Sequence, residues 1–142
     1  MRDAIDGVDK TVLTARLNEK WSAQENIGHL LDIEPLWIRR VNDIISETPV
    51  MRSADLKNLK THFAEHNNND AHTLINELEA SRNKWFPLLK DFNDEDRAKT
   101  SKHPRLERPM NLLYMMYFVS EHDDHHLQTI HYLIDTIEKM KP

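Results

Sequence analysis

The sequence predicts an all-α protein folded as a single domain over residues 1–142. Three observations favour this fold class. The chain has only two glycines, no strand-length segment alternates apolar with polar residues, and three long stretches repeat apolar residues at helical spacing. A chain of 142 residues is also long enough for one domain with a substantial hydrophobic core.

The first long helix is predicted from Ala23 to about Ser46. Ser22 and Glu25 form an S-x-x-E capping box, in which each side chain accepts a hydrogen bond from the backbone N–H of the other residue. Pro35 lies inside this helix, where it removes one backbone hydrogen bond and is expected to bend the helix. The apolar face comprises Ile27, Leu30, Ile33, Trp37, Val41 and Ile44.

The middle of the chain predicts two more helices. One is expected from Ala71 to about Phe92, with Asp70 as its N-cap and Pro87 distorting its last turn. A shorter one is expected from Ala54 to about His66, and its apolar side comprises Leu56, Leu59 and Phe63.

The last helix is predicted from Pro109 to Met140, with the proline in its first turn. The polar segment Asn93–Arg108 precedes it and is expected to be the long crossover that an up-down bundle needs. The start of the helix is apolar nearly all round, which indicates deep burial or a dimer contact; the residues are Met110, Met115, Met116, Tyr117 and Phe118.

Composition and charge exclude several classes of function. A net charge of −5 and a pI near 6.0 give no electrostatic reason to expect a nucleic-acid partner. The longest apolar run, Leu112–Val119, is too short to span a membrane, and no signal peptide stands at the start, so we expect a cytoplasmic protein without membrane contact. Because the chain has no cysteine, it can form no disulfide and offers neither a thiolate metal ligand nor a thiol nucleophile.

His122 and His126 lie one turn apart on the apolar stripe of the last helix. The apolar members of this stripe are Leu112, Met115, Val119, Ile130, Leu133 and Ile137. Burial of an unpartnered polar group costs about 1–3 kcal/mol, so both imidazoles need a partner, and a divalent metal ion would serve both. The alternative is a pair of core histidines hydrogen-bonded to neighbouring side chains. A second pair with the same spacing, His62 and His66, lies in a charged, Asn-rich segment and is the weaker candidate.

His29 is the expected third ligand, because it flanks the apolar face of its helix two turns after the capping box. Three imidazoles leave one open position on tetrahedral Zn²⁺, or three on octahedral Ni²⁺ or Fe²⁺.

Three further residues are candidates for holding the ligand imidazoles in place. Asp32 lies one turn after His29 and could accept a hydrogen bond from a ligand ring, although a solvated helix charge is an equal alternative. Asp123 follows His122 in a segment formally similar to the H-E-x-x-H motif of zinc proteases, but its side chain is shorter than that of the glutamate general base. His125 lies at the edge of the stripe and is expected to be an outer or interface residue. No catalytic base can be assigned from the sequence.

Two segments resemble motifs of the DinB/YfiT-like superfamily of metal-dependent four-helix-bundle proteins. Trp21–Asp32 is similar to the family pattern W-[ST]-x-x-E-x-x-x-H-L-x-D, and Glu121–His126 is similar to its second histidine motif. The resemblance implies an up-down-down-up bundle, one bound Zn²⁺ or Ni²⁺ held by His29, His122 and His126, and a homodimer. Members usually carry a complete first helix, of which only Met1–Ile5 could remain here, since Asp6-Gly7 interrupts it.

The resemblance implies a metal-dependent enzyme acting on a small molecule. Thiol S-transfer is the first expectation, with a low-molecular-weight thiol as co-substrate, and hydrolysis is the second. The alternative is a non-catalytic stress-response protein, in which the metal ion of a dimer mainly holds two helices together.

Overall fold

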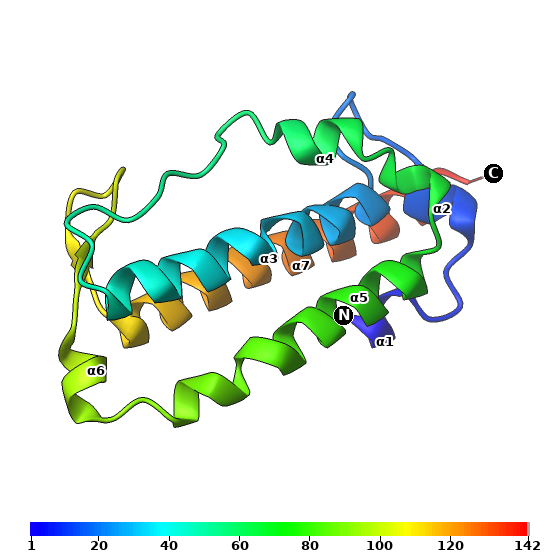
Figure 1. Cartoon of the computed structure of the whole chain (residues 1–142). Coiled ribbons are helices and arrows are strands. Elements are labelled where there is room, and N and C mark those ends of the chain that lie inside the picture. The colour runs from blue at the N-terminus through cyan, green and yellow to red at the C-terminus, as the bar shows by residue number, and fades with distance from the viewer. Residues whose placement is uncertain (142) are drawn as a thin grey trace.

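The computed structural model describes residues 1–141 and is mainly helical, as predicted (Figure 1). Its long helices are α3 (Ala23–Ile45), α5 (Ala71–Trp85) and α7 (Leu112–Met140). The shorter elements are α1 (Arg2–Ile5), α2 (Lys10–Thr14), α4 (Leu59–Phe63), the 3₁₀ turns η1 (His66–Asn68) and η2 (Pro87–Lys90), α6 (Asp94–Ala98), and the two-stranded antiparallel sheet of β1 (Ser101–Lys102) and β2 (Pro109–Met110). Among residues 1–141, none of the helices has the length and hydropathy that a transmembrane segment requires.

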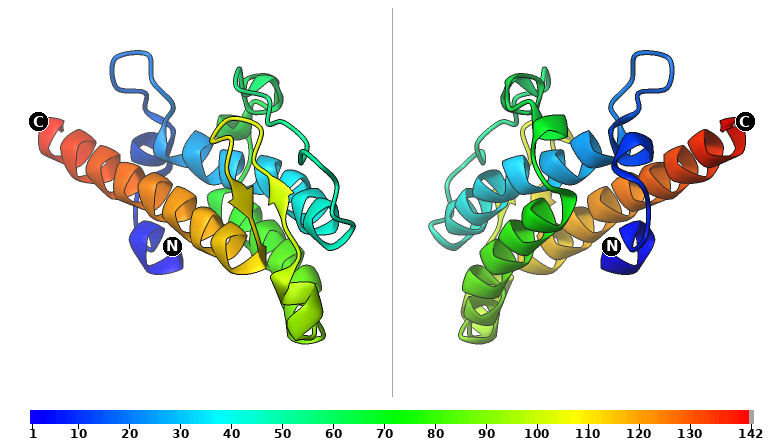
Figure 2. Two further views of the ribbon diagram at one scale, coloured as in Figure 1. Left: turned by 90° about the vertical axis from the view of Figure 1, so that its left-hand side faces the viewer. Right: turned by 90° about the vertical axis from the view of Figure 1, so that its right-hand side faces the viewer.

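Helices α3 and α7 lie side by side along most of their length and run in opposite directions, while α5 packs against α3 and runs in the same direction as α3 (Figure 1). The chain therefore has to return along the bundle between α3 and α5, and residues 46–70 make this crossover. The expectation that Asn93–Arg108 is the crossover was wrong. That segment turns at one end of the bundle, where it forms α6, β1 and the loop that leads into β2 (Figure 2), because α5 and α7 are antiparallel and need only a local connection.

Two short helices take the place of a first long helix, in agreement with the predicted interruption. Gly7 separates α1 from α2 with a φ of +75°, a conformation that glycine adopts without strain. Ile5, Val12 and Leu13 are buried against apolar side chains of α5 and α7. The short N-terminal helices thus close one half of the core.

The apolar faces predicted for α3 and α7 form the interior. Of the predicted apolar residues on α3, only Ile33 is not fully buried, and on α7 only Ile137 is not. Helix α3 runs through Pro35 without a break, and its capping box is present as predicted. Met110 and Met115 are buried, but Tyr117 is 65% exposed. The start of α7 is therefore not buried on all sides.

Several predicted helix boundaries were wrong. The α-helix expected over Ala54–His66 is limited to α4, and Leu56 and Phe63, expected on its apolar side, are 71% and 79% exposed. Helix α5 ends at Trp85, because Pro87 begins a 3₁₀ turn. Pro109 belongs to β2, and α7 starts after Asn111, whose side chain caps the backbone N–H of Tyr114.

Candidate metal centre

Three histidines from two helices converge where α3 packs against α7. His29 comes from α3, and His122 and His126 come from successive turns of α7. Each offers one ring nitrogen, and these three atoms lie within 4.8 Å of one another. The structure thus brings together all three residues predicted as ligands.

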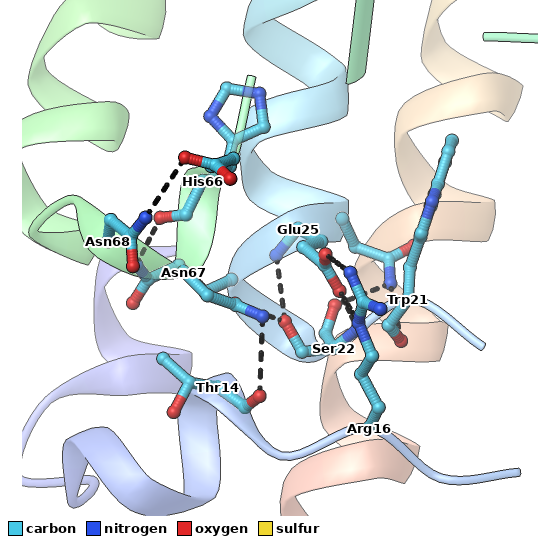
Figure 3. Close-up of polar contacts among 11 residues, drawn as sticks. Thr14, Arg16, Trp21, Ser22, Glu25, His66, Asn67 and Asn68 are labelled. Atoms are coloured by element: carbon cyan, nitrogen blue, oxygen red, sulfur yellow. Dashed lines mark hydrogen bonds and ion pairs between the residues drawn. The ribbon is translucent and has the colours of Figure 1, made fainter. Parts of the chain in front are cut away.

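The capping box determines where His29 enters the interface. Ser22 accepts the backbone N–H of Glu25, and the Glu25 carboxylate accepts the backbone N–H of Ser22 at 2.8 Å. Arg16 forms an ion pair with Glu25, and the Asn67 side chain joins Ser22 to the carbonyl oxygen of Thr14 (Figure 3). The first turn of α3 is therefore tied to the N-terminal segment and to the crossover, which fixes the rotation of the helix that carries His29.

The crossover supplies a hydrogen-bond chain behind His29. The Thr61 hydroxyl lies 3.1 Å from His29 Nδ1 and donates to Asp32 Oδ2 at 3.0 Å. A hydroxyl that donates its proton to a carboxylate can only accept from the imidazole, so His29 carries its proton on Nδ1, and Nε2 is free to bind a metal ion. His66 Nε2 lies 2.8 Å from the same Asp32 oxygen. Burial alone would raise the pKa of Asp32. The hydrogen bonds from His66 and Thr61 nevertheless hold this pKa below its ordinary value.

His126 is oriented by an amide from α3. Its Nδ1 lies 2.8 Å from Asn26 Oδ1, and the Asn26 amide nitrogen donates to the carbonyl oxygen of Ser22 at 2.8 Å. The second bond identifies Oδ1 as the acceptor, so His126 also carries its proton on Nδ1. Its Nε2 is likewise left free.

His122 lies beside a partly buried ionic network. Its Nδ1 is 3.9 Å from Asp123 Oδ1 and has no hydrogen-bond partner among the described residues. Arg82 of α5 forms ion pairs with both Asp123 and Glu34, and Glu34 also accepts the indole N–H of Trp85 at 2.9 Å. The network links α3, α5 and α7 directly behind the histidine cluster.

The protonation state of two of the three rings suits a metal ion. Burial, with the facing charge of His122 as the second cause, lowers the pKa of His29 from 6.5 to about 4. The same causes lower the pKa of His126 to about 3. Both rings are therefore neutral near pH 7, the state in which imidazole binds a metal ion.

The donor set fits a divalent metal ion. It consists of three imidazole rings on two helices, and two of the rings are held by a hydrogen bond at the nitrogen opposite Nε2. The separation of up to 4.8 Å is wider than the ~3.3 Å between ligands around tetrahedral zinc, so small rotations of the side chains would complete the site.

The cluster opens into a cavity of about 510 Å³. Its aromatic lining includes Trp21, Trp37 and Phe118, and its polar lining includes Arg40, His103 and Arg105. The three histidines of the cluster also line it. A small molecule in this cavity could therefore reach a metal ion held by them.

The three predicted positioning residues have different surroundings. Asp32 contacts His29 only through Thr61. Asp123 lies near His122 but pairs with Arg82, and these neighbours hold its pKa below the ordinary value against the effect of burial. His125 is exposed and touches His126 only ring edge to ring face, with centroids 5.3 Å apart. The roles proposed for these residues stay predictions.

Sequence reasoning did not identify Thr61, Asn26 or His66 as part of the site. Asn26 lies one turn before His29 on the same helix, and this spacing could have predicted that the two side chains lie on the same face. Thr61 and His66 belong to the crossover, whose path no local pattern predicts. His66 was considered only with His62, as the weaker candidate pair in a charged, Asn-rich segment, yet it is buried against Gly28.

Comparisons with known proteins identify one family and one similar fold. The family model described as the DinB superfamily matches residues 1–130. Among solved structures, the fold is similar to YfiT from Bacillus subtilis, with a TM-score of 0.81 and 20% sequence identity over 96% of this chain and 79% of that chain. YfiT is described as a probable metal-dependent hydrolase with an unusual four-helix bundle topology. No curated protein matches the chain.

Proposed function

The chain belongs to the DinB superfamily, and on this premise we propose that it is a metal-dependent enzyme acting on a small molecule. In this proposal His29, His122 and His126 bind one divalent ion, Zn²⁺ or Ni²⁺. The observation that carries the proposal is the convergence of the three histidines at a cavity, with two rings held by hydrogen bonds that leave Nε2 free.

A divalent ion bound there would supply a Lewis acid to a molecule in the cavity. The chain's own residues do the rest. Trp21, Trp37 and Phe118 exclude water and offer flat apolar surfaces for a substrate, while Thr61 and Asn26 keep two ligand rings in one orientation.

Two reaction classes fit this arrangement. In thiol S-transfer, the nucleophile is the sulfur of a low-molecular-weight co-substrate, since the chain has no cysteine. In hydrolysis, the nucleophile is water, and the description of YfiT as a probable metal-dependent hydrolase supports this class. We propose thiol transfer as the first of the two reaction classes and hydrolysis as the second. The predicted location of the protein is the cytoplasm.

The second candidate function is a non-catalytic metal-binding homodimer. It is favoured by an exposed apolar row on α7, where Leu113, Tyr114 and Tyr117 are 74%, 61% and 65% exposed. Sedimentation analysis of the protein beside a Leu113→Glu/Tyr117→Glu variant tests the dimer, because two carboxylates in this row would separate the subunits.

The first test is elemental analysis of untagged protein purified without chelator. About one Zn or Ni per chain is expected, and His122→Ala should lose it. His131→Ala is the matched control, because His131 lies on the same helix but is exposed, and it should retain the metal. Absence of metal from the wild-type protein, even after incubation with Zn²⁺ and Ni²⁺, would refute the metal centre.

Turnover then separates the two candidate functions. Metal-loaded protein is assayed for thiol conjugation to small electrophiles and for hydrolysis of esters, amides and phosphoesters. For an enzyme, His122→Ala should abolish turnover with the far-UV circular dichroism largely retained. If the metal is structural, the same change should sharply lower the melting temperature, and the wild-type protein should turn over no substrate.

A further inference from the structure

Arg40 of α3 is a buried cation without a carboxylate partner among the described residues. The residue is only 2% exposed. Its Nε donates to the carbonyl oxygen of Arg52 at 3.0 Å, and its Nη1 lies 3.2 Å from His103 Nε2. Asp43 is the acid whose charge acts on Arg40, and the Arg52 side chain donates to both of its carboxylate oxygens. Within residues 1–141, Nη2 of Arg40 makes no hydrogen bond.

His103 does not compensate this charge. Its Nδ1 accepts the backbone N–H groups of Arg105 and Leu106 at 3.3 and 3.1 Å. A neutral imidazole that accepts at Nδ1 carries its proton on Nε2, and this proton faces the Arg40 guanidinium. Burial and the charges of Arg40 and Arg105 keep the pKa of His103 below its ordinary value, and burial lowers the pKa of Arg40 to about 10. Arg40 and His103 are thus two neighbouring donors with no acceptor between them.

The same cavity contains this cationic end and the three-histidine cluster. Arg40, His103 and Arg105 line it together with His29, His122 and His126. Trp37 lies between the two groups of residues. Its ring centroid is 5.4 Å from the ring centroid of His122 and 5.6 Å from Cζ of Arg40. Asp55 also lines the cavity, but its carboxylate oxygens accept the backbone N–H groups of Lys57 and Leu59.

We propose that Arg40 and His103 form an oxyanion-binding subsite that holds a carboxylate or phosphate group of the substrate. Arg40 would donate from Nη2 and His103 from Nε2, so the anion would supply the missing acceptor. The chain carries a net charge of −5, so the attraction is local to this end of the cavity. The subsite itself does not depend on a metal ion. In the proposed function, the subsite would also orient the reacting group of an anionic substrate toward the three histidines. This orientation rests on the proposed function.

Anion binding can be measured on the metal-free protein. Inorganic phosphate or acetate is added at constant ionic strength, and the indole N–H resonance of Trp37, assigned with Trp37→Phe, is followed by NMR. We expect a saturable shift with at least one anion. Arg40→Gln should weaken binding about ten-fold or more, since a charge-assisted hydrogen bond is lost. Arg39→Gln removes an exposed neighbouring charge and should leave the affinity unchanged. Comparison of the two anions shows which oxyanion the subsite prefers.

Arg40→Lys keeps the charge but not the guanidinium fork, and it provides the comparison if Arg40→Gln does not fold. It should bind more weakly than the wild-type protein. The proposal is overturned if neither anion gives a saturable shift in the wild-type protein, or if Arg39→Gln weakens binding as much as the Arg40 variants do.

A second titration tests the link to the three histidines. Zinc-loaded protein, its zinc content determined first, is titrated calorimetrically with 3-mercaptopropionate, 4-mercaptobutyrate and 6-mercaptohexanoate, and with their amides. At the length that spans the cavity, the acid should bind about ten-fold more tightly than its amide, and Arg40→Gln should remove this preference. Equal affinity of acid and amide at every length would refute the orientation. Failure to load zinc would refute the proposed function, while the phosphate and acetate titrations would still decide the subsite.

Discussion

Replacement of Gly28 by alanine tests whether the crossover is held against α3 as the structure describes. A Cβ atom at this position would lie 2.2 Å from Cγ and Cδ2 of His66 and 2.6 Å from its Nδ1. These distances are far below van der Waals contact, so the buried ring would have to move away from α3 and release Asp32.

The expected magnitude follows from two opposing effects. Alanine is favoured over glycine inside a helix by about 1 kcal/mol. The hydrogen bond between His66 and the Asp32 carboxylate is worth about 1.5–3 kcal/mol, because one partner is charged. Gly28→Ala should therefore lower the free energy of unfolding by about 0.5–2 kcal/mol, which corresponds to a melting temperature about 1–8 °C lower for a chain of this length.

A double-mutant cycle on the metal-free protein provides the assay, with thermal unfolding followed by circular dichroism. In a His66→Ala background the three nearest atoms are gone, so Gly28→Ala should stabilise the protein by up to about 1 kcal/mol. The effect of one substitution should thus change sign with the background. The reasoning would be refuted if Gly28→Ala stabilised the protein in both backgrounds, or destabilised it equally in both.

Two other predictions concern the histidine cluster. Thr61→Val removes the hydroxyl that accepts from His29 and should weaken metal binding about ten-fold, as measured by competition with a chelator. Thr61→Ser keeps the hydroxyl and should bind the metal nearly as well as the wild-type protein. Equal metal affinities for all three proteins would contradict the hydrogen-bond chain. The metal-free protein should also lose stability as the pH falls from 6.5 toward 4, because the unfolded chain then binds protons that His29 and His126, with folded pKa values of about 4 and 3, do not. Each histidine lowers the free energy of unfolding by at most about 1.4 kcal/mol per pH unit, and the full stability is present above pH 6.5. Urea denaturation at pH 7 and pH 5 should show this loss in the wild-type protein. The His29→Gln/His126→Gln variant should lose much less stability between the same two pH values.

Much of the helical framework could be predicted because it depends on short-range patterns. The capping box at Ser22 and Glu25 marks the start of α3 within one turn, and the spacing of apolar residues identifies the buried faces of α3 and α7. Since His29, His122 and His126 lie on or beside those faces, the packing of two amphipathic helices was enough to predict that they meet.

The sequence by itself thus determined the helical fold class, the buried faces of the long helices and the three histidines that come together. Only the tertiary structure decided what surrounds them. Thr61 and His66 reach α3 through the crossover, and His103 reaches Arg40 from 63 residues away, near the β1–β2 hairpin. The physical reason is that helix periodicity arises from residues three or four positions apart, whereas the path of a polar connecting segment depends on contacts made only after the helices have packed.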